Sequence, residues 1–140
     1  MADGIPVVGH AKGLIHYACG DEEGGDRAMR SCTRSSGVIA GGVAGFFMGG
    51  PVGAVGGGIA AGVSMDSIAT AVTDRPSGYI AAVEAVQKNP SPGGIFDLVA
   101  MPVFDGMAGY SAGQSFNEIV HAGKFDEQQF SKLNNIYVIL

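Results

Sequence analysis

The apolar positions near the start of the chain recur at the spacing of one helix face. They are Val7, Val8, Ala11, Leu14, Ile15, Ala18 and Cys19. This period predicts a helix over residues 6–19. Gly20 is expected to end that helix, and the acidic residues 21–23 suit the start of the next one, where carboxylates meet the positive end of the helix dipole.

The chain has no charged residue from position 35 to position 65, a run of 31 residues. Within this run glycine recurs at every fourth position: Gly37, Gly41, Gly45, Gly49, Gly53 and Gly57, with Gly58 and Gly62 continuing the spacing one residue out of phase. A spacing of four places small residues on one helical stripe, which a second backbone can approach closely. Pro51, directly after two glycines, favours a break between two helices. The pattern predicts a hairpin of glycine-rich helices over about 26–48 and 51–73.

Glycine weakens such helices, since each one costs about 1 kcal/mol relative to alanine inside a helix. Eleven glycines lie between positions 37 and 62. Close backbone packing across the stripe, with van der Waals and Cα–H···O contacts, is the available compensation. The remaining positions of the run are apolar nearly all round the helix, so the hairpin is expected to be buried in an assembly or in lipid.

The second half of the chain also has helical spacing. It predicts a short helix over 79–88, a loop over 89–94 and a helix over 95–122 with a break or kink at Pro102. That last helix repeats the small-residue theme at Gly106, Gly109 and Gly113, and Asp126 is expected to cap a final short helix ending at residue 132. Residues 136–140 form an apolar, β-prone tail that is expected to dock on the protein's own core or on a neighbouring subunit. The predicted fold is therefore a single all-α domain over residues 1–140, built around a central hairpin at about 26–73.

Composition and charge exclude several classes of protein. Glycine makes up 24 of 140 residues, more than twice the usual share of about 7%. Disorder is disfavoured because 46% of the residues are hydrophobic and only 15% are charged. A formal net charge of −5 argues against nucleic acid as a partner. No signal peptide is visible, so we expect a cytoplasmic protein or an already processed secreted form.

Few residues suggest chemistry. Residues 109–113 match the G-x-S-x-G pattern of serine hydrolases, but the expected context is helical and the only later histidine is His121. His10, His16, Cys19 and the acidic residues 21–23 are close in sequence without a metal-ligand spacing, and no phosphate-binding loop is present. We therefore predict no cofactor, no metal and no catalytic residue. The carboxylates Asp66, Asp97 and Asp105 are interpreted as helix ends or as partners for arginines.

The two cysteines, Cys19 and Cys32, allow either one disulfide or two free thiols. Buried free thiols are the preferred interpretation, and a disulfide between them stays open as the alternative. Thirteen positions separate the two, and sequence alone does not place their Cβ atoms.

The stretch over residues 37–62 resembles a glycine zipper, the G-x-x-x-G-x-x-x-G element of small self-assembling or membrane-associated proteins. The resemblance is one of packing, covers about a fifth of the chain, and implies helix association through Gly37, Gly41, Gly45, Gly49, Gly53, Gly57 and Gly62, to which we add Gly109 and Gly113. Two hypotheses follow. The first is a non-catalytic structural protein that associates with itself as a homo-oligomer or filament. The alternative is a membrane-active protein whose hairpin inserts or forms a pore, although about 14 uncharged residues before Pro51 fall short of the roughly 20 that span a bilayer.

Overall fold

The computed structural model describes residues 6–137, and side chains up to residue 123. Four helices cover this part of the chain: α1 (Pro6–Ala18), α2 (Glu22–Thr73), α3 (Gly78–Lys88) and α4 (Pro92–Tyr137). No strand lies among the described residues, and the fold is all-α, as the hydrophobic spacing predicted.

The turn between α1 and α2 forms where the sequence predicted it. Gly20 has a φ of +79°, a left-handed conformation that favours glycine. Asp21 then caps α2: its carboxylate accepts a hydrogen bond from the Gly24 N–H at 2.9 Å and contacts the His16 ring at 2.7 Å. The Gly24 N–H first, and the His16 ring second, hold the pKa of Asp21 below its ordinary value. The acidic run therefore acts as a helix start.

The long helix α2 is in fact two antiparallel arms joined at a sharp turn. Gly49 (φ −145°, ψ 21°) and Gly50 (φ 60°, ψ −147°) leave the helical conformation, and Pro51 begins the second arm. Gly50 needs the positive φ that residues with a Cβ rarely adopt. This turn is the predicted break, so the hairpin of two glycine-rich helices is present.

Helix α4 differs from the prediction. It begins at Pro92 and runs without interruption to Tyr137, through Pro102 and through the position of the expected cap at Asp126. Pro102 removes only one backbone donor, and the isolated Gly123 is a weak helix breaker, so neither ends the helix. The expected break at Pro102 and the separate last helix are therefore wrong, whereas the kink at Pro102 stays a prediction. Ile136 and Tyr137 are helical, whereas residues 138–140 of the predicted tail lie outside the described residues.

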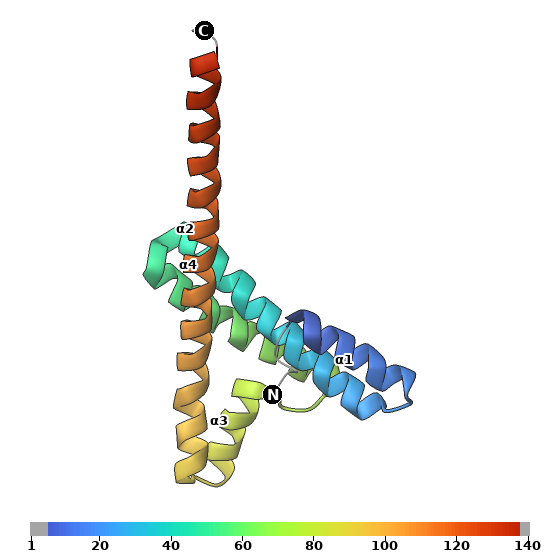
Figure 1. Cartoon of the computed structure of the whole chain (residues 1–140). Coiled ribbons are helices and arrows are strands. Elements are labelled where there is room, and N and C mark those ends of the chain that lie inside the picture. The colour runs from blue at the N-terminus through green and yellow to red at the C-terminus, as the bar shows by residue number, and fades with distance from the viewer. Residues whose placement is uncertain (1–5, 138–140) are drawn as a thin grey trace.

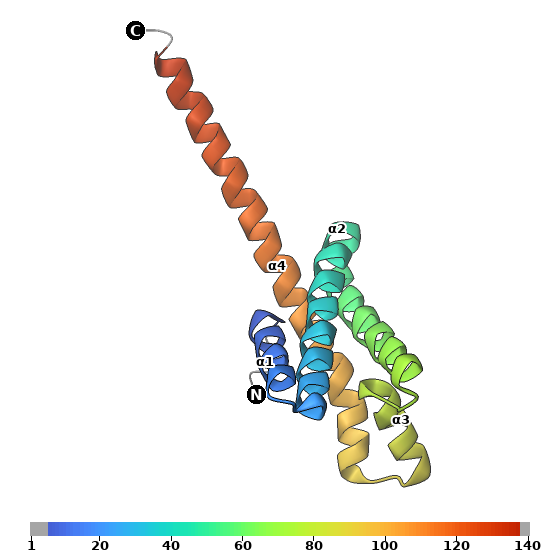
Figure 2. The same cartoon turned by 90° about the vertical axis from the view of Figure 1, so that its right-hand side faces the viewer.

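Figures 1 and 2 show how the helices are arranged. Helix α4 crosses the hairpin and continues past its turn as a single projecting helix, in both views. Helix α1 packs along the first arm of α2, and α3 lies beside the first turns of α4. The hairpin is therefore the element that contacts every other helix of the described chain.

The core of the described part consists of small side chains. Its buried hydrophobic residues are Ala28, Cys32, Val38, Ala54 and Ala82. Large hydrophobic side chains instead lie at the surface, including Met48, which is 90% exposed, and Val52, which is 83% exposed. Backbone proximity, and not the burial of large side chains, is thus what brings these helices together.

The cysteines are both free, so the disulfide alternative is not formed. Cys32 is buried, and its Sγ donates to the Met29 carbonyl oxygen at 3.2 Å. Cys19 is exposed, in contrast to the expectation that both thiols are buried, because it lies in the turn after the last residue of α1.

This difference predicts the reactivity of the two thiols. A water-soluble disulfide reagent such as Ellman's reagent is expected to label one thiol per native chain, at Cys19, and the second only after unfolding. A Cys19→Ser variant serves as the control and should show no fast labelling. Equal labelling rates for both thiols in the native protein would contradict the burial of Cys32.

Candidate functional site

A seam of glycines joins the two arms of α2. A Cβ atom added to Gly45 would overlap the carbonyl oxygen of Gly53, and one added to Gly53 would overlap that of Gly45. Gly41 and Gly57 form a second reciprocal pair, and a Cβ on Gly41 would also meet the Ala61 Cβ at 2.5 Å. Real Cβ atoms essentially never come within 3.0 Å of such atoms. The arms are thus in backbone contact along the seam, at a distance that only glycine permits.

A second glycine stripe, one residue after the first in each arm, contacts α4. A Cβ on Gly58 would meet the Asp105 carbonyl oxygen at 2.5 Å and the Gly109 Cα at 2.9 Å. Gly42 faces the same Gly109 backbone at distances that no Cβ would tolerate. The neighbouring glycines 41 and 42, like 57 and 58, therefore serve two different partners. The role of Gly42 was missed, although the doubled glycines were visible in the sequence.

The other predicted packing glycines have varied surroundings. A Cβ on Gly37 would meet the Met65 side chain at 2.6 Å, and one on Gly113 would lie 2.9 Å from the Phe46 Cβ. Gly62 is buried against Asp105 and the Arg34 guanidinium. Gly49 lies outside the seam: it is part of the turn, and nothing lies within 4 Å of a Cβ added to it. Gly49 fits the four-residue spacing of the sequence but does not pack against another helix, because the backbone leaves the helical conformation at this position.

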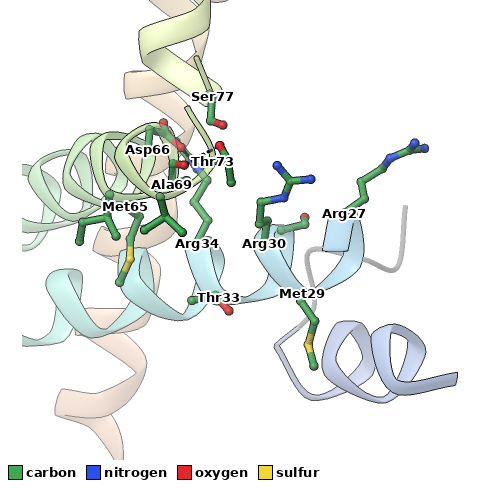
Figure 3. Close-up of a pocket in the computed structure, with 14 residues that line it drawn as sticks. Arg27, Met29, Arg30, Thr33, Arg34, Met65, Asp66, Ala69, Thr73 and Ser77 are labelled. Atoms are coloured by element: carbon green, nitrogen blue, oxygen red, sulfur yellow. Dashed lines mark hydrogen bonds and ion pairs between the residues drawn. The ribbon is translucent and has the colours of Figure 1, made fainter. Parts of the chain in front are cut away.

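Beyond the seam, one arginine connects three helical segments (Figure 3 shows its pairing with Asp66). The Arg34 Nε and Nη2 donate to the two Asp66 oxygens at 2.7 and 3.1 Å. Its Nη1 and Nη2 donate to the two Asp105 oxygens at 2.8 and 2.7 Å. Asp66 also accepts the Tyr79 N–H at 2.9 Å, which fixes the start of α3. The Arg34 cluster, meaning Arg34, Asp66 and Asp105, thus ties both arms of α2 to α4 and to α3.

The Arg34 cluster is shielded from water. The side chains of Asp66 and Asp105 are only 3% and 11% exposed, and that of Arg34 is 28% exposed. Hydrogen bonds to Asp105, and then to Asp66, raise the pKa of Arg34 above its ordinary value, against the lowering effect of its partial burial. Each carboxylate is paired in a bidentate geometry, the strongest form of this interaction. The sequence had predicted arginine partners for these carboxylates without identifying which arginine.

The other sequence motifs do not form a chemical site. Residues 109–113 lie inside α4, with Gly109 and Gly113 buried against the hairpin, so Ser111 has no strand-to-helix turn to activate it. No group of three or more His, Cys, Asp or Glu residues among the described residues has a geometry that would hold a metal ion. His16 is instead the partner of Asp21.

A groove lies at the open end of the hairpin, where the glycine seam has ended. Its volume is about 570 Å³, and both arms contribute to it (Figure 3). Arg27, Arg30 and Arg34 line it from the first arm, and apolar residues such as Ile68 and Val72 line it from the second.

A second hollow, about 660 Å³ in volume, lies where the outer face of the second arm meets α4. We call it the outer apolar face; it is lined by Val55, Ile59, Pro102, Val103, Gly106, Met107, Tyr110 and Ser111. None of these residues is charged. Met107 is 61% exposed and Val103 is 52% exposed, so this face is open to a partner.

Comparison with known proteins adds no relationship: no family model, curated protein or solved structure matches the chain.

Proposed function

We propose that this chain is a non-catalytic structural protein that associates with itself as a homo-oligomer or filament. The observation that carries the proposal is that large apolar side chains lie at the surface of the described chain and small ones lie in its core. Twenty-one large hydrophobic residues are exposed in the described part of the chain, whereas its buried hydrophobic residues are small. Monomeric soluble proteins rarely expose contiguous apolar patches beyond a few hundred Å². A partner surface would remove this area from water.

The glycine seam explains why the apolar residues face outward. Because the arms touch through their backbones, no space remains between them for large side chains. The bulky residues of each arm must then lie on its other faces, as Phe47 and Val52 do. Burial is worth roughly 25 cal/mol per Å² of apolar surface. Association through these faces is therefore the available source of further stability for a helix pair with little core of its own.

The outer apolar face is the surface we assign to this contact. It combines two elements that are already fixed by the Gly58–Gly109 crossing, so its shape is set before association. Preformed surfaces bind with a smaller entropic cost. The projecting part of α4, which has no partner helix in Figures 1 and 2, gives a second surface. Two different surfaces on one chain support a head-to-tail contact, which closes into a ring or continues as a filament.

Met107→Glu tests this proposal. A carboxylate in the outer apolar face would have to be desolvated on association, so the variant is expected to shift the protein from assemblies to monomers of about 14 kDa. Size-exclusion chromatography with light scattering measures this. Gln87→Glu on α3, an exposed position, is the matched control because it adds the same charge elsewhere and should leave the assembly unchanged. A wild-type protein that stays monomeric at high concentration would contradict the proposal.

The membrane-active alternative has its own supporting observation. Among the described residues, one helix, α2, is long and apolar enough to cross a membrane, and only 17% of its most apolar stretch is buried. However, each arm carries about 14 uncharged residues, or about 21 Å at 1.5 Å per residue, against a hydrocarbon core of about 30 Å. A bilayer that received the turn would also meet the projecting part of α4 (Figures 1 and 2). Phe116 of α4 contacts Phe47 near the turn, and Glu118 and His121, which follow it in α4, are exposed. Co-sedimentation with liposomes distinguishes the two: association without lipid favours the structural protein, and partitioning into vesicles favours the alternative.

A further inference from the structure

The groove at the open end of the hairpin has the composition of a ligand site. It exists because the seam ends at Gly37, and beyond this point the side chain of Met65 enters between the arms. Its volume of about 570 Å³ falls within the range of about 300–1,000 Å³ that small-molecule sites occupy. The groove shares no residue with the outer apolar face, so it is independent of the proposed self-association.

The second arm supplies an apolar wall. Met65, Ile68, Ala69 and Val72 follow one another at helical spacing along the groove. Ile68 is 57% exposed and Val72 is 77% exposed, so this wall faces the groove without a covering side chain from the described part of the chain. An aliphatic chain laid along the groove would remove this surface from water.

The first arm supplies positive charge. Three arginines line the groove, and Asp66 is the only carboxylate among the described residues that does so, in a protein with a formal net charge of −5. Arg34 is already neutralised by Asp66 and Asp105, and Arg27 forms an exposed pair with Glu23 at 3.2 Å. Arg30 donates its Nε to the Asp26 carbonyl oxygen at 3.2 Å, and its two terminal nitrogens have no hydrogen-bond partner among the described residues. The guanidinium of Arg30 is therefore available to an anion.

We propose that this groove binds a fatty acid with a straight acyl chain of about the length of dodecanoate. The carboxylate would pair with the terminal nitrogens of Arg30, since a guanidinium presents two parallel donors that match a carboxylate. The acyl chain would lie against Ile68 and Val72. The described lining contains no aromatic side chain on which a base or sugar could stack, so an anionic aliphatic molecule fits it better than a nucleotide does.

Titration calorimetry with dodecanoate, below its micelle concentration, tests this proposal on the full chain. We expect saturable binding of one molecule per chain, which Arg30→Gln weakens at least tenfold and Val72→Asp abolishes. Arg75→Gln is the matched control: Arg75 is an exposed arginine that does not line the groove, although Thr73, two residues earlier, does, and this variant should bind as the wild type does. Circular dichroism verifies that each variant is folded.

Dodecyltrimethylammonium is the second probe, with the same chain and the opposite charge. It should not bind saturably if Arg30 recognises the carboxylate. Equal binding of both probes, or equal affinity of Arg30→Gln and wild type for dodecanoate, would show adsorption to exposed apolar surface and overturn the proposal. Absence of dodecanoate binding would overturn it too. The Met107→Glu variant should still bind dodecanoate, so failure of the fatty-acid site is distinguishable from failure of self-association.

Discussion

Replacing Gly45 by leucine is expected to abolish the folded hairpin. A Cβ at this position would overlap the Gly53 carbonyl oxygen, and the obstructing atom is backbone, which cannot rotate away as a side chain would. Overpacking a well-packed core with extra side-chain atoms costs about 1–3 kcal/mol, and here two helices would also have to separate along their whole seam. With domain stabilities of about 5–15 kcal/mol, we expect the cooperative thermal transition to disappear. Circular dichroism during a temperature ramp measures this.

Gly56 provides a matched control in the same helix. Nothing lies within 4 Å of a Cβ added there, so Gly56→Leu should keep a cooperative transition, at or above the wild-type temperature. Gly56→Ala should raise the free energy of unfolding by about 1 kcal/mol through helix propensity alone. If Gly45→Leu unfolds like Gly56→Leu, the arms are not in backbone contact and the description of the seam is wrong.

The hairpin could be predicted from the sequence because two local signals agreed. Glycine every four residues defined one stripe, and the Gly-Gly-Pro sequence at 49–51 defined the turn. Neither signal depends on distant residues. The pairing of Gly45 with Gly53 then follows from the turn, since antiparallel arms place residues at equal distances from the turn opposite each other.

The path of α4 could not be predicted in the same way. Pro102 and Gly123 are local breakers, yet the helix continues through both, because tertiary contacts of Gly106, Gly109 and Gly113 with the hairpin outweigh local preference on the N-terminal side of the helix. The packing role of Gly42 was not predicted for a related reason. The sequence shows that glycines form stripes along one helix. It does not show which stripe contacts the other arm and which contacts α4, because that depends on how the helices cross.

The candidate sites depended even more on long-range geometry. Asp105 lies 71 positions from Arg34, and sequence alone offered four arginines as partners for the carboxylates. The groove at Arg30 had no sequence signal, because its two walls come from separate arms and its volume arises where the seam stops. The exposed apolar residues were predictable only in part, because the uncharged run contains five of the twenty-one, Ile39, Phe47, Met48, Val52 and Val55, and the others lie outside it.

Small residues account for both the stability and the exposure of this protein. Glycine stripes let three helical segments touch through their backbones, which leaves close contacts but little apolar area buried within the chain. A buried ionic cluster makes such packing more specific, because its charged groups are paired in only one arrangement of the helices. We infer that the Arg34 cluster fixes the position of α4 on the hairpin, where the glycine stripes alone would allow sliding.

Replacing Arg34 by methionine is therefore expected to destabilise the protein by about 3–5 kcal/mol, the usual cost of leaving a buried charge without its partner. Asp66 and Asp105 would lose the cation that they share, in a nearly dry site where their side chains are 3% and 11% exposed. Arg34→Lys should be intermediate, because one ammonium group cannot reproduce four hydrogen bonds to two carboxylates. Urea unfolding measures the differences.

A triple variant separates the loss of charge pairing from simple loss of packing. Arg34→Met, Asp66→Asn, Asp105→Asn should recover most of the stability that Arg34→Met loses, since no buried charge remains and an asparagine oxygen can still accept the Tyr79 N–H. If the triple variant is no more stable than Arg34→Met, the cluster contributes packing alone and does not fix α4 through its charges.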